Sequence, residues 1–407
     1  MSCLSDASSR PEPFRPITCP RIQCSAFRCW DPPGGISPTG PWQTTCDIKV
    51  SRSVLVSLES YRYLPLSATG KMLRALTVLS LLFSKPPQPS GLNITVLQPD
   101  VPFVPHPRLL SGAASDSKEI IRQFVQLDRS TKWKLVDKVK FEGDTYEPEG
   151  LVRIGDDRYF VSAGEYIVPT VKYNETINGT DRTAGEGFAH MIIFDSKGKR
   201  IADASISQAK SLEYHNGGID YDGTYIWATL SQYRPNTTGT LVRMRPDTLV
   251  PEPILSVADH QGGAVHDTKS GTVVTLNWGS RKASIWNGHD KPPAPPELTR
   301  PKAEVKNPSS FVDYQDCKFL GRYELYGTRP VMLCSGVADL ANTRIGGLAI
   351  VDMETMVPLH EVPVTLVSEL GAAMTKNPMD VAIVDGKMRL YFLPDERNST
   401  LYVYEAV

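Results

Sequence analysis

Five short stretches of this 407-residue chain carry side chains that could do chemistry, and they look like variants of one another. Each begins with polar residues, which are followed by a small residue and then by an apolar or β-prone run. They read EPEGL at 147–151, HNGGI at 215–219, HQGGA at 260–264, YQDCK at 314–318 and NPMDV at 377–381. Imidazoles, amides and carboxylates at matching positions of a repeat predict one shared site.

Two histidines and one glutamate are the candidate catalytic groups. His215 and His260 hold matching positions in successive copies of the repeat. An unperturbed imidazole, with a pKa of about 6.5, suits a general base at neutral pH. Glu149 is the third candidate catalytic residue. Four further polar residues are predicted to bind a ligand: Glu147, Gln261, Gln315 and Asn377.

A divalent cation is one chemistry that this set of residues could support. Ca²⁺ prefers carboxylate and amide oxygens, and the predicted ligands are Glu149, Asn216, Asp316 and Asp380. The cation would polarise the carbonyl group of a small lactone or ester before its hydrolysis.

Three alternatives remain open from the residues alone. The carboxylates could simply accept backbone hydrogen bonds where loops enter strands, as buried polar groups do. The mouth could bind a small polar ligand or a protein without turnover. Glu149 with Asp316 or Asp380 could instead form the carboxylate pair of a glycoside hydrolase.

The elements that must position these residues are predicted to be the blades of an all-β propeller. Each stretch leads into a strand, an Asp/Gly turn, a second strand, a loop and a third strand. Four-stranded units that recur every ~40–60 residues are typical of this fold. We expect five blades, or six if residues 84–131 hide another. The fifth unit stops at Val407 after three strands, so a strand near residues 132–141 is expected to complete it and cover its edge.

The propeller is expected to span residues 132–407, with residues 91–131 as a linker or wrapping arm that contains a short helix. Residues 72–90 have a basic start, a short apolar run and a Pro-rich exit, which is typical of a secretory signal. The apolar run is too short to cross a bilayer, which takes roughly 20 helical residues. We expect residues 1–71 to be disordered or an upstream extension, with Met72 as the true start; a buried N-terminal helix is the alternative.

Other sequence features agree with export from the cell. Five N-glycosylation sequons follow the signal-like segment, at Asn93, Asn174, Asn178, Asn236 and Asn398. An oxidising compartment would permit a Cys317–Cys334 disulfide in place of two buried thiols. The net charge of −1, without a basic patch, makes nucleic acid and anionic membranes poor partners. We therefore expect a secreted monomeric glycoprotein whose partner is a small polar ligand at the propeller axis.

The stretch from about Trp133 to Val407 resembles secreted propellers of an uncharacterised family. More distantly, it is similar to gluconolactonase and strictosidine-synthase-like propellers. The resemblance is carried by EPEGL at 147–151, HNGGIDYDG at 215–223 and NPMDVAIVDG at 377–386. It implies a lactonase in which Glu149, Asn216 and Asp380 hold a divalent metal. The chain has EGL where the lactonases have EGP, and it has no GxSxG or HExxH motif.

Overall fold

The computed structural model describes residues 92–105, 111–288, 298–309, 312–341 and 343–407. The expectations for residues 1–71 and for the signal-like segment at 72–90 lie outside these residues. No helix in the described part of the chain is long and apolar enough to cross a membrane.

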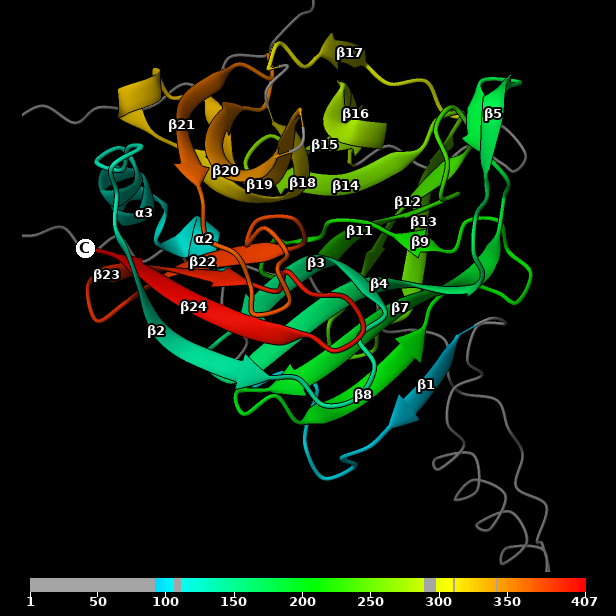
Figure 1. The fold of residues 1–407 in the computed structure, drawn as a ribbon, viewed down its shortest axis with the longest axis horizontal. Coiled ribbons are helices and arrows are strands. Elements are labelled where there is room, and N and C mark those ends of the chain that lie inside the picture. Colours follow the sequence, from blue (N-terminus) through cyan, green and yellow to red (C-terminus); the bar gives the residue numbers. More distant parts are fainter. Residues whose placement is uncertain (1–91, 106–110, 289–297, 310–311, 342) are drawn as a thin grey trace, which may run out of the picture. The chain divides into compact units, whose positions relative to one another are not determined.

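Five antiparallel sheets stand around one axis and form a five-bladed β-propeller (Figure 1). The prediction of an all-β propeller with five blades is therefore confirmed. Blade 1 runs outward from the axis through β3 (Glu147–Ile154), β4 (Arg158–Val168), β7 (Glu186–Asp195), β8 (Arg200–Ser205) and β1 (Asn93–Val96). Blade 2 contains β9 (His215–Asn216), β10 (Asp220–Tyr221), β11 (Ile226–Ser231), β12 (Gly239–Met244) and β13 (Pro251–Val257).

The next two blades follow the four-stranded pattern. Blade 3 contains β14 (Gln261–Asp267), β15 (Thr272–Asn277), β16 (Lys282–Asn287) and β17 (Ala303–Lys306), with a 3₁₀ turn at Trp278–Ser280. Blade 4 contains β18 (Asp313–Arg322), β19 (Pro330–Leu340), β20 (Thr343–Asp352) and β21 (Pro358–Val364), with a 3₁₀ turn at Glu324–Tyr326.

Blade 5 is completed by a strand from the other end of the propeller sequence. It contains β22 (Met379–Val384), β23 (Lys387–Phe392), β24 (Thr400–Ala406) and, on its outer edge, β2 (Trp133–Lys140). β2 pairs antiparallel with β24 from Trp133 opposite Ala406 to Lys140 opposite Thr400. The predicted closing strand is thereby confirmed, and it covers the edge that β24 would otherwise expose.

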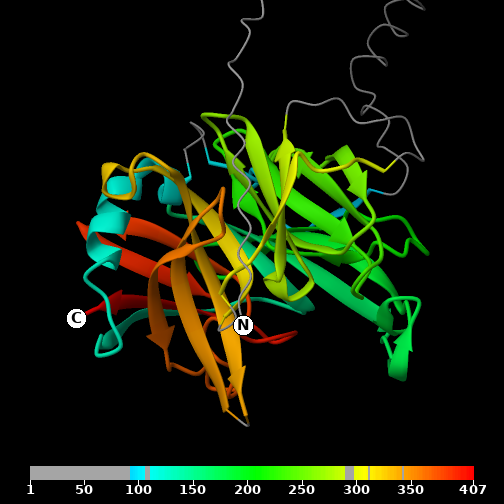
Figure 2. The ribbon, with the colours of Figure 1, turned by 90° about the horizontal axis from the view of Figure 1, so that it is seen from above.

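The segment before β2 adds to the propeller without forming another blade in the described residues. β1 pairs antiparallel with β8 and becomes the fifth strand of blade 1. Two short helices, α2 (Gly112–Ser115) and α3 (Ser117–Phe124), lie beside blades 4 and 5 (Figure 2). α3 coincides with the expected short helix, and its apolar face buries Ile120, Ile121 and Phe124.

Glycine pairs allow the innermost strands of blades 2 and 3 to touch through their backbones. The Gly218 amide donates to the Gly262 carbonyl at 2.8 Å, and Gly218 forms a parallel bridge with Gly263. A Cβ atom on Gly217 would lie 2.4 Å from the Gly262 oxygen. Only glycine fits this approach, which brings the starts of both strands close to the axis.

A buried ion pair occupies the axis itself. Lys318 Nζ lies 2.7 Å from Asp316 Oδ1, and both side chains have 1% exposure or less. The Asp316 carboxylate also accepts backbone amides from three other blades: Leu151 at 3.1 Å, Ile219 at 3.2 Å and Met379 at 3.2 Å. One carboxylate thus connects blades 1, 2, 4 and 5. Its ion pair and hydrogen bonds offset the cost of burying its charge.

Two more buried aspartates connect neighbouring blades in the same way. Asp220 accepts the His266 amide at 3.2 Å, and Asp380 accepts the Arg153 amide at 2.6 Å. Burial raises the pKa of Asp316 to about 7 and that of Asp220 to about 6, and the Lys318 charge opposes both shifts.

The predicted disulfide is present. Cys317 and Cys334 lie directly opposite each other on β18 and β19, with their sulfur atoms bonded and both side chains buried in the core of blade 4. The bridge therefore fixes the strand that carries Asp316 and Lys318.

Replacing Lys318 should be among the most destabilising single changes in the core. Lys318→Met leaves the Asp316 carboxylate buried without its cation, which typically costs about 3–5 kcal/mol. The loss should be larger at pH 8 than at pH 5, because Asp316 can take up a proton at the lower pH. Urea denaturation at both values measures this. Lys134→Met, at an exposed position of β2, is the control, and equal losses in the two variants would contradict the prediction.

Candidate functional site at the axial mouth

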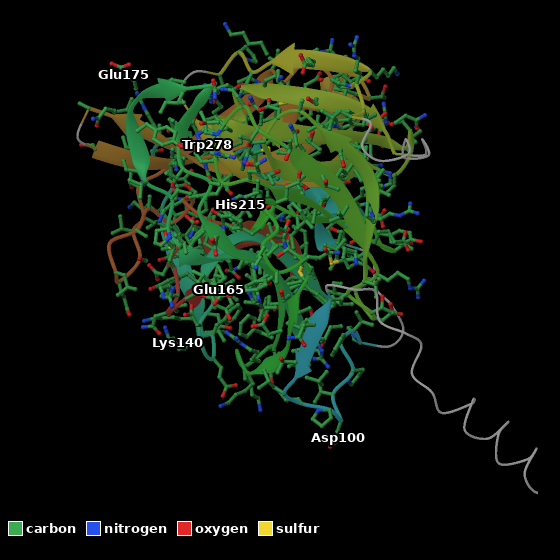
Figure 3. All side chains as sticks on the ribbon, turned by 90° about the vertical axis from the view of Figure 1, so that its right-hand side faces the viewer. Asp100, Lys140, Glu165, Glu175, His215 and Trp278 are labelled. Atoms are coloured by element: carbon green, nitrogen blue, oxygen red, sulfur yellow. A yellow bond between two sulfur atoms is a disulfide. The ribbon has the colours of Figure 1, made fainter. Side chains whose placement is uncertain are left out.

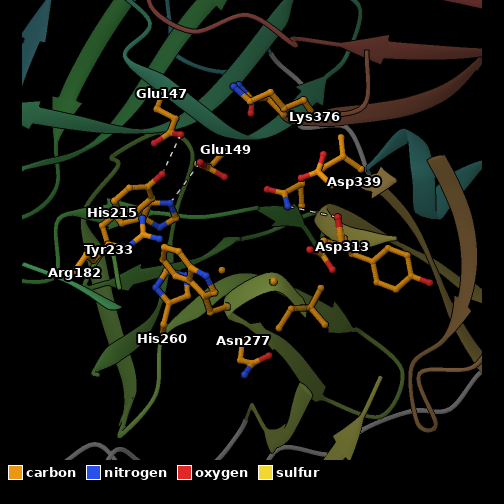
Figure 4. A pocket seen from close by; sticks show the side chains of 18 of the residues that line it. Glu147, Glu149, Arg182, His215, Tyr233, His260, Asn277, Asp313, Asp339 and Lys376 are labelled. Atoms are coloured by element: carbon orange, nitrogen blue, oxygen red, sulfur yellow. Dashed lines mark hydrogen bonds and ion pairs between the residues drawn. The ribbon is translucent and has the colours of Figure 1, made fainter. Parts of the chain in front are cut away.

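A cavity of about 370 Å³ lies at one mouth of the axis, and residues from all five blades line it (Figure 4). Six of the sequence-predicted site residues are among them: Glu147, Glu149, His215, His260, Gln315 and Asn377. They come together because each stands at or just before the start of an innermost strand, where the five strands converge.

The other four predicted residues do not line this cavity. The Gln261 side chain donates to the His260 carbonyl and accepts a hydrogen bond from the Thr275 hydroxyl. Its amide group is therefore hydrogen-bonded within blade 3. Asn216 Nδ2 donates to the His190 carbonyl at 2.8 Å. Asp316 and Asp380 accept backbone amides behind the mouth, as described above.

The predicted metal ligands do not fit a divalent cation. Only Glu149 faces the cavity, while both oxygens of Asp316 are already used by Lys318 and backbone amides. Within the described ranges, no group of three or more His, Cys, Asp or Glu side chains is arranged to hold a metal ion. The carboxylates of Asp316 and Asp380 instead fit the alternative of strand-entry hydrogen bonding.

Glu147, Glu149 and His215 form one charged cluster on the blade 1 and blade 2 side. His215 Nε2 lies 3.4 Å from Glu149 Oε1, and both side chains are buried. Burial alone would lower the pKa of His215, but the hydrogen bond and charge of Glu149 outweigh it and raise the pKa. This favours an imidazolium that is paired with a carboxylate.

Glu147 has the opposite character, that of a carboxyl group that holds its proton. Burial and the adjacent Glu149 charge raise the pKa of Glu147 to about 7, against the opposing effect of a hydrogen bond from Tyr166. Its Oε2 accepts that Tyr166 hydroxyl, and its Oε1 accepts the Tyr233 hydroxyl at 3.3 Å. Two neighbouring carboxyl groups in different environments, one accepting tyrosine hydroxyls and the other beside an imidazole, are typical of acid–base sites.

His260 stays neutral across the physiological range. Burial and the neighbouring His215 charge lower its pKa to about 3, and its Nδ1 lies 2.7 Å from the Gln232 carbonyl. Because that carbonyl can only accept, Nδ1 carries the hydrogen and Nε2 is left as an acceptor. The ring centroids of His215 and His260 are 5.2 Å apart.

Sequence reasoning missed an aromatic wall with an arginine on it. Tyr233 and Trp278 lie 5.5 Å apart by ring centroid, and the Arg182 guanidinium lies 4.6 Å from the Trp278 centroid and 5.6 Å from that of Tyr233. Tyr233 and Trp278 each follow the second strand of their blade, so a comparison of strand ends could have found them. Arg182 stands in an insertion outside the repeat, and no repeat pattern points to it.

The opposite side of the cavity is polar and carries balanced charges. Asp339 pairs with Arg344 at 2.7 Å, and Lys376 pairs with Glu396. Asn377 is buried, and its Nδ2 has no hydrogen-bond partner among the described residues.

A family model matches residues 107–407, which include every strand of the propeller except β1. The chain belongs to DUF6454, a family of unknown function. That the propeller belongs to a family of uncharacterised function is therefore confirmed, whereas the likeness to gluconolactonases stays a prediction. No curated protein matches the chain.

Solved structures are similar to the chain only distantly. A tail fibre of Staphylococcus aureus phage P68 has a TM-score of 0.37 at 10% identity, over 72% of this chain and 56% of its own. An exo-1,5-α-L-arabinanase from a bovine ruminal metagenomic library has a TM-score of 0.36 at 10% identity, over 65% of this chain and 94% of its own. The PQQ-bound aldose sugar dehydrogenase of Streptomyces coelicolor has a TM-score of 0.33 at 13% identity, over 68% of this chain and 99% of its own. The chain thus spans little more than half of the phage protein, and nothing about function follows from these likenesses.

The raised pKa of Glu147 predicts a pH-dependent stability difference in this DUF6454 propeller. The folded protein holds a proton on Glu147 that the unfolded chain has lost, so its free energy of unfolding falls as pH rises from 4.5 to about 7. Glu147→Gln has no carboxyl group at this position, so its free energy of unfolding does not fall for this reason. It should gain stability relative to wild type over that interval, up to about 3 kcal/mol at higher pH.

Urea denaturation between pH 4.5 and 9 measures this difference. The control is Glu186→Gln, which removes an exposed carboxylate on β7. Parallel pH curves for wild type and Glu147→Gln would show that the carboxyl group at 147 titrates normally.

Proposed function

We propose that this DUF6454 propeller hydrolyses a small, polar ester or lactone at its axial mouth by carboxyl acid–base catalysis. The observation that carries the proposal is the placement of Glu147 and Glu149 in one cavity with different partners. Glu149 pairs with the His215 imidazole, and Glu147 accepts two tyrosine hydroxyls.

The reaction follows from these two environments. Glu149 accepts a proton from a water molecule as the water oxygen attacks the carbonyl carbon, and the carbonyl π electrons move onto its oxygen. When that oxyanion collapses, the bond from carbon to the alcohol oxygen breaks, and Glu147 donates its proton to the departing oxygen. The products are a carboxylic acid and an alcohol, and the proton on Glu149 then returns to Glu147 through solvent.

The remaining residues of the cavity support this division of roles. His215 Nε2 lies 3.4 Å from Glu149 Oε1, which positions this carboxyl group of the cavity as the proposed base. Tyr233 and Trp278 supply aromatic rings to one side of the cavity, while Gln315 and Asn377 line the other side.

Hydrolysis of 4-nitrophenyl acetate and of δ-valerolactone by the purified protein tests the proposal. Glu147→Gln and Glu149→Gln should each lower kcat by about 10²–10⁴, the usual contribution of a general acid or base. Glu186→Gln should have no effect. If Glu147→Gln and Glu149→Gln both hydrolyse the probes at the wild-type rate, these residues are not the general acid and base.

A wild-type protein that hydrolyses neither probe would contradict the hydrolase proposal. Such a result would favour the alternative of a propeller that binds its ligand without turnover. Release of 4-nitrophenol from 4-nitrophenyl glycosides would instead favour glycoside hydrolysis by the same pair of carboxyl groups.

We also propose that the protein is secreted and glycosylated. All five sequon asparagines are exposed: Asn93, Asn174, Asn178, Asn236 and Asn398. Protein recovered from the medium of eukaryotic cells should lose mass on enzymatic removal of N-glycans. Asn→Gln changes at the five positions should abolish that shift, and a wild-type protein of unchanged mass would contradict the proposal.

A further inference from the structure

We infer that Arg182 binds the carbonyl oxygen of the substrate and stabilises the oxyanion that forms on it. The inference rests on the proposed hydrolysis, because an oxyanion arises only when water attacks a carbonyl carbon. The acid and base of that proposal, Glu147 and Glu149, carry no positive charge for this oxygen. Of the positively charged side chains that line the cavity, Arg182 is the one that lies over the rings of Tyr233 and Trp278.

Arg182 is supplied by an insertion rather than by the five-bladed frame. Between β4 and β7 of blade 1 the chain leaves the sheet and forms a hairpin of β5 (Lys172–Ile177) and β6 (Thr180–Arg182). Glu175 lies toward the outer end of this hairpin, whereas Trp278 and His215 lie nearer the body of the propeller (Figure 3). Arg182 ends β6 and reaches back to the cavity.

The guanidinium group is held by an ion pair and by two aromatic rings. Nε and Nη2 donate to the two oxygens of Asp181 at 2.8 and 3.0 Å, and the central carbon lies over the rings of Trp278 and Tyr233. The side chain is 12% exposed. Among the described residues, no hydrogen bond to a protein group uses Nη1, so the bound guanidinium keeps one donor group free for a ligand.

The hairpin itself is anchored to the propeller at two points and closed at its base, which fixes where Arg182 lies. The side chain of Asn236 donates to the Gly179 carbonyl at 2.7 Å, at the hairpin turn. The Tyr214 hydroxyl donates to the Ala184 carbonyl at 2.6 Å, just after β6. The Thr183 hydroxyl accepts the Val171 amide at 2.9 Å and closes the base. A donor held this way needs little reorganisation when charge develops beside it.

Tyr233 places Arg182 and the proposed acid around one position. Its ring lies under the guanidinium, and its hydroxyl donates to Glu147. A substrate carbonyl between them would have the donor on its oxygen and the acid near its leaving group. Figure 4 shows Arg182, Tyr233, Glu147 and His215 on the same side of the cavity.

The charged side chains that line the cavity are balanced in number. The lining contains four acidic side chains (Glu147, Glu149, Asp313, Asp339) and four basic ones (Lys172, Arg182, Arg344, Lys376). A substrate carbonyl group beside Arg182 gains most from the guanidinium charge as its oxygen becomes negative.

Arg182 could instead serve only to fasten the hairpin to Trp278, and kinetics with 4-nitrophenyl acetate separate the two roles. Arg182→Ala should lower kcat by about 10²–10³, the usual cost of losing an oxyanion donor, and change KM little. Arg182→Lys should fall between wild type and Arg182→Ala. Added guanidinium chloride at non-denaturing concentration should restore part of the kcat of Arg182→Ala, which a fastening role does not predict.

Lys172→Ala is the matched control, because Lys172 lines the same cavity from the same hairpin. It should leave kcat unchanged. A wild-type kcat for Arg182→Ala in an enzyme that hydrolyses the probe would overturn the role of Arg182 and leave the proposed function intact. A lowered kcat that guanidinium does not restore and that Arg182→Lys does not improve would also overturn it.

Binding of methyl phenylphosphonate, a monoanionic mimic of the tetrahedral intermediate, tests Arg182 without turnover. By calorimetry, Arg182→Ala should bind it at least tenfold more weakly than wild type and Lys172→Ala. If the wild type hydrolyses no probe but shows this pattern, the proposed reaction and the catalytic role of Arg182 both fail, and Arg182 is left as an anion-binding group of the cavity. Equal binding by wild type and Arg182→Ala, or no binding at all, overturns that role.

Discussion

The buried ion pair of Asp316 and Lys318 is the interaction on which the propeller depends. A lone charge at the axis would be very costly, and here one carboxylate receives an ammonium and three backbone amides from different blades. Lys318 in turn donates to the Ile219 carbonyl at 2.5 Å. The centre of the ring is therefore occupied by a polar network, and the cavity with Glu147 and Glu149 lies at the mouth.

This network separates carboxyl groups that look alike in the sequence. Asp220, Asp316 and Asp380 lie within the axis and spend their oxygens on amides of neighbouring blades. Glu147 and Glu149 stand two residues apart at the start of β3, before the strand enters the core, and both face the cavity. The partners around each acid therefore decide which ones connect blades and which ones face the cavity.

The blades and the closing strand were predictable because they rest on local patterns: a repeated strand order, turn residues and one missing strand. The cavity's core of Glu147, Glu149, His215 and His260 followed from the same repeat. The amides that occupy Asp316 and Asp380 come from residues far apart in the sequence, such as Leu151 and Met379, and no local pattern reveals them. Arg182 escaped because the hairpin that carries it has no counterpart in the other blades.

The pairing of β2 with β24 has a consequence for how the molecule is made. The two strands are separated by the whole ring, so β2 leaves the ribosome first and has no partner until Thr400–Ala406 emerges. Contacts of such long sequence separation form slowly. During synthesis the unfinished ring carries an open strand edge, which is the kind of surface that chaperones protect. The last seven-residue strand thus determines when the protein becomes safe from aggregation.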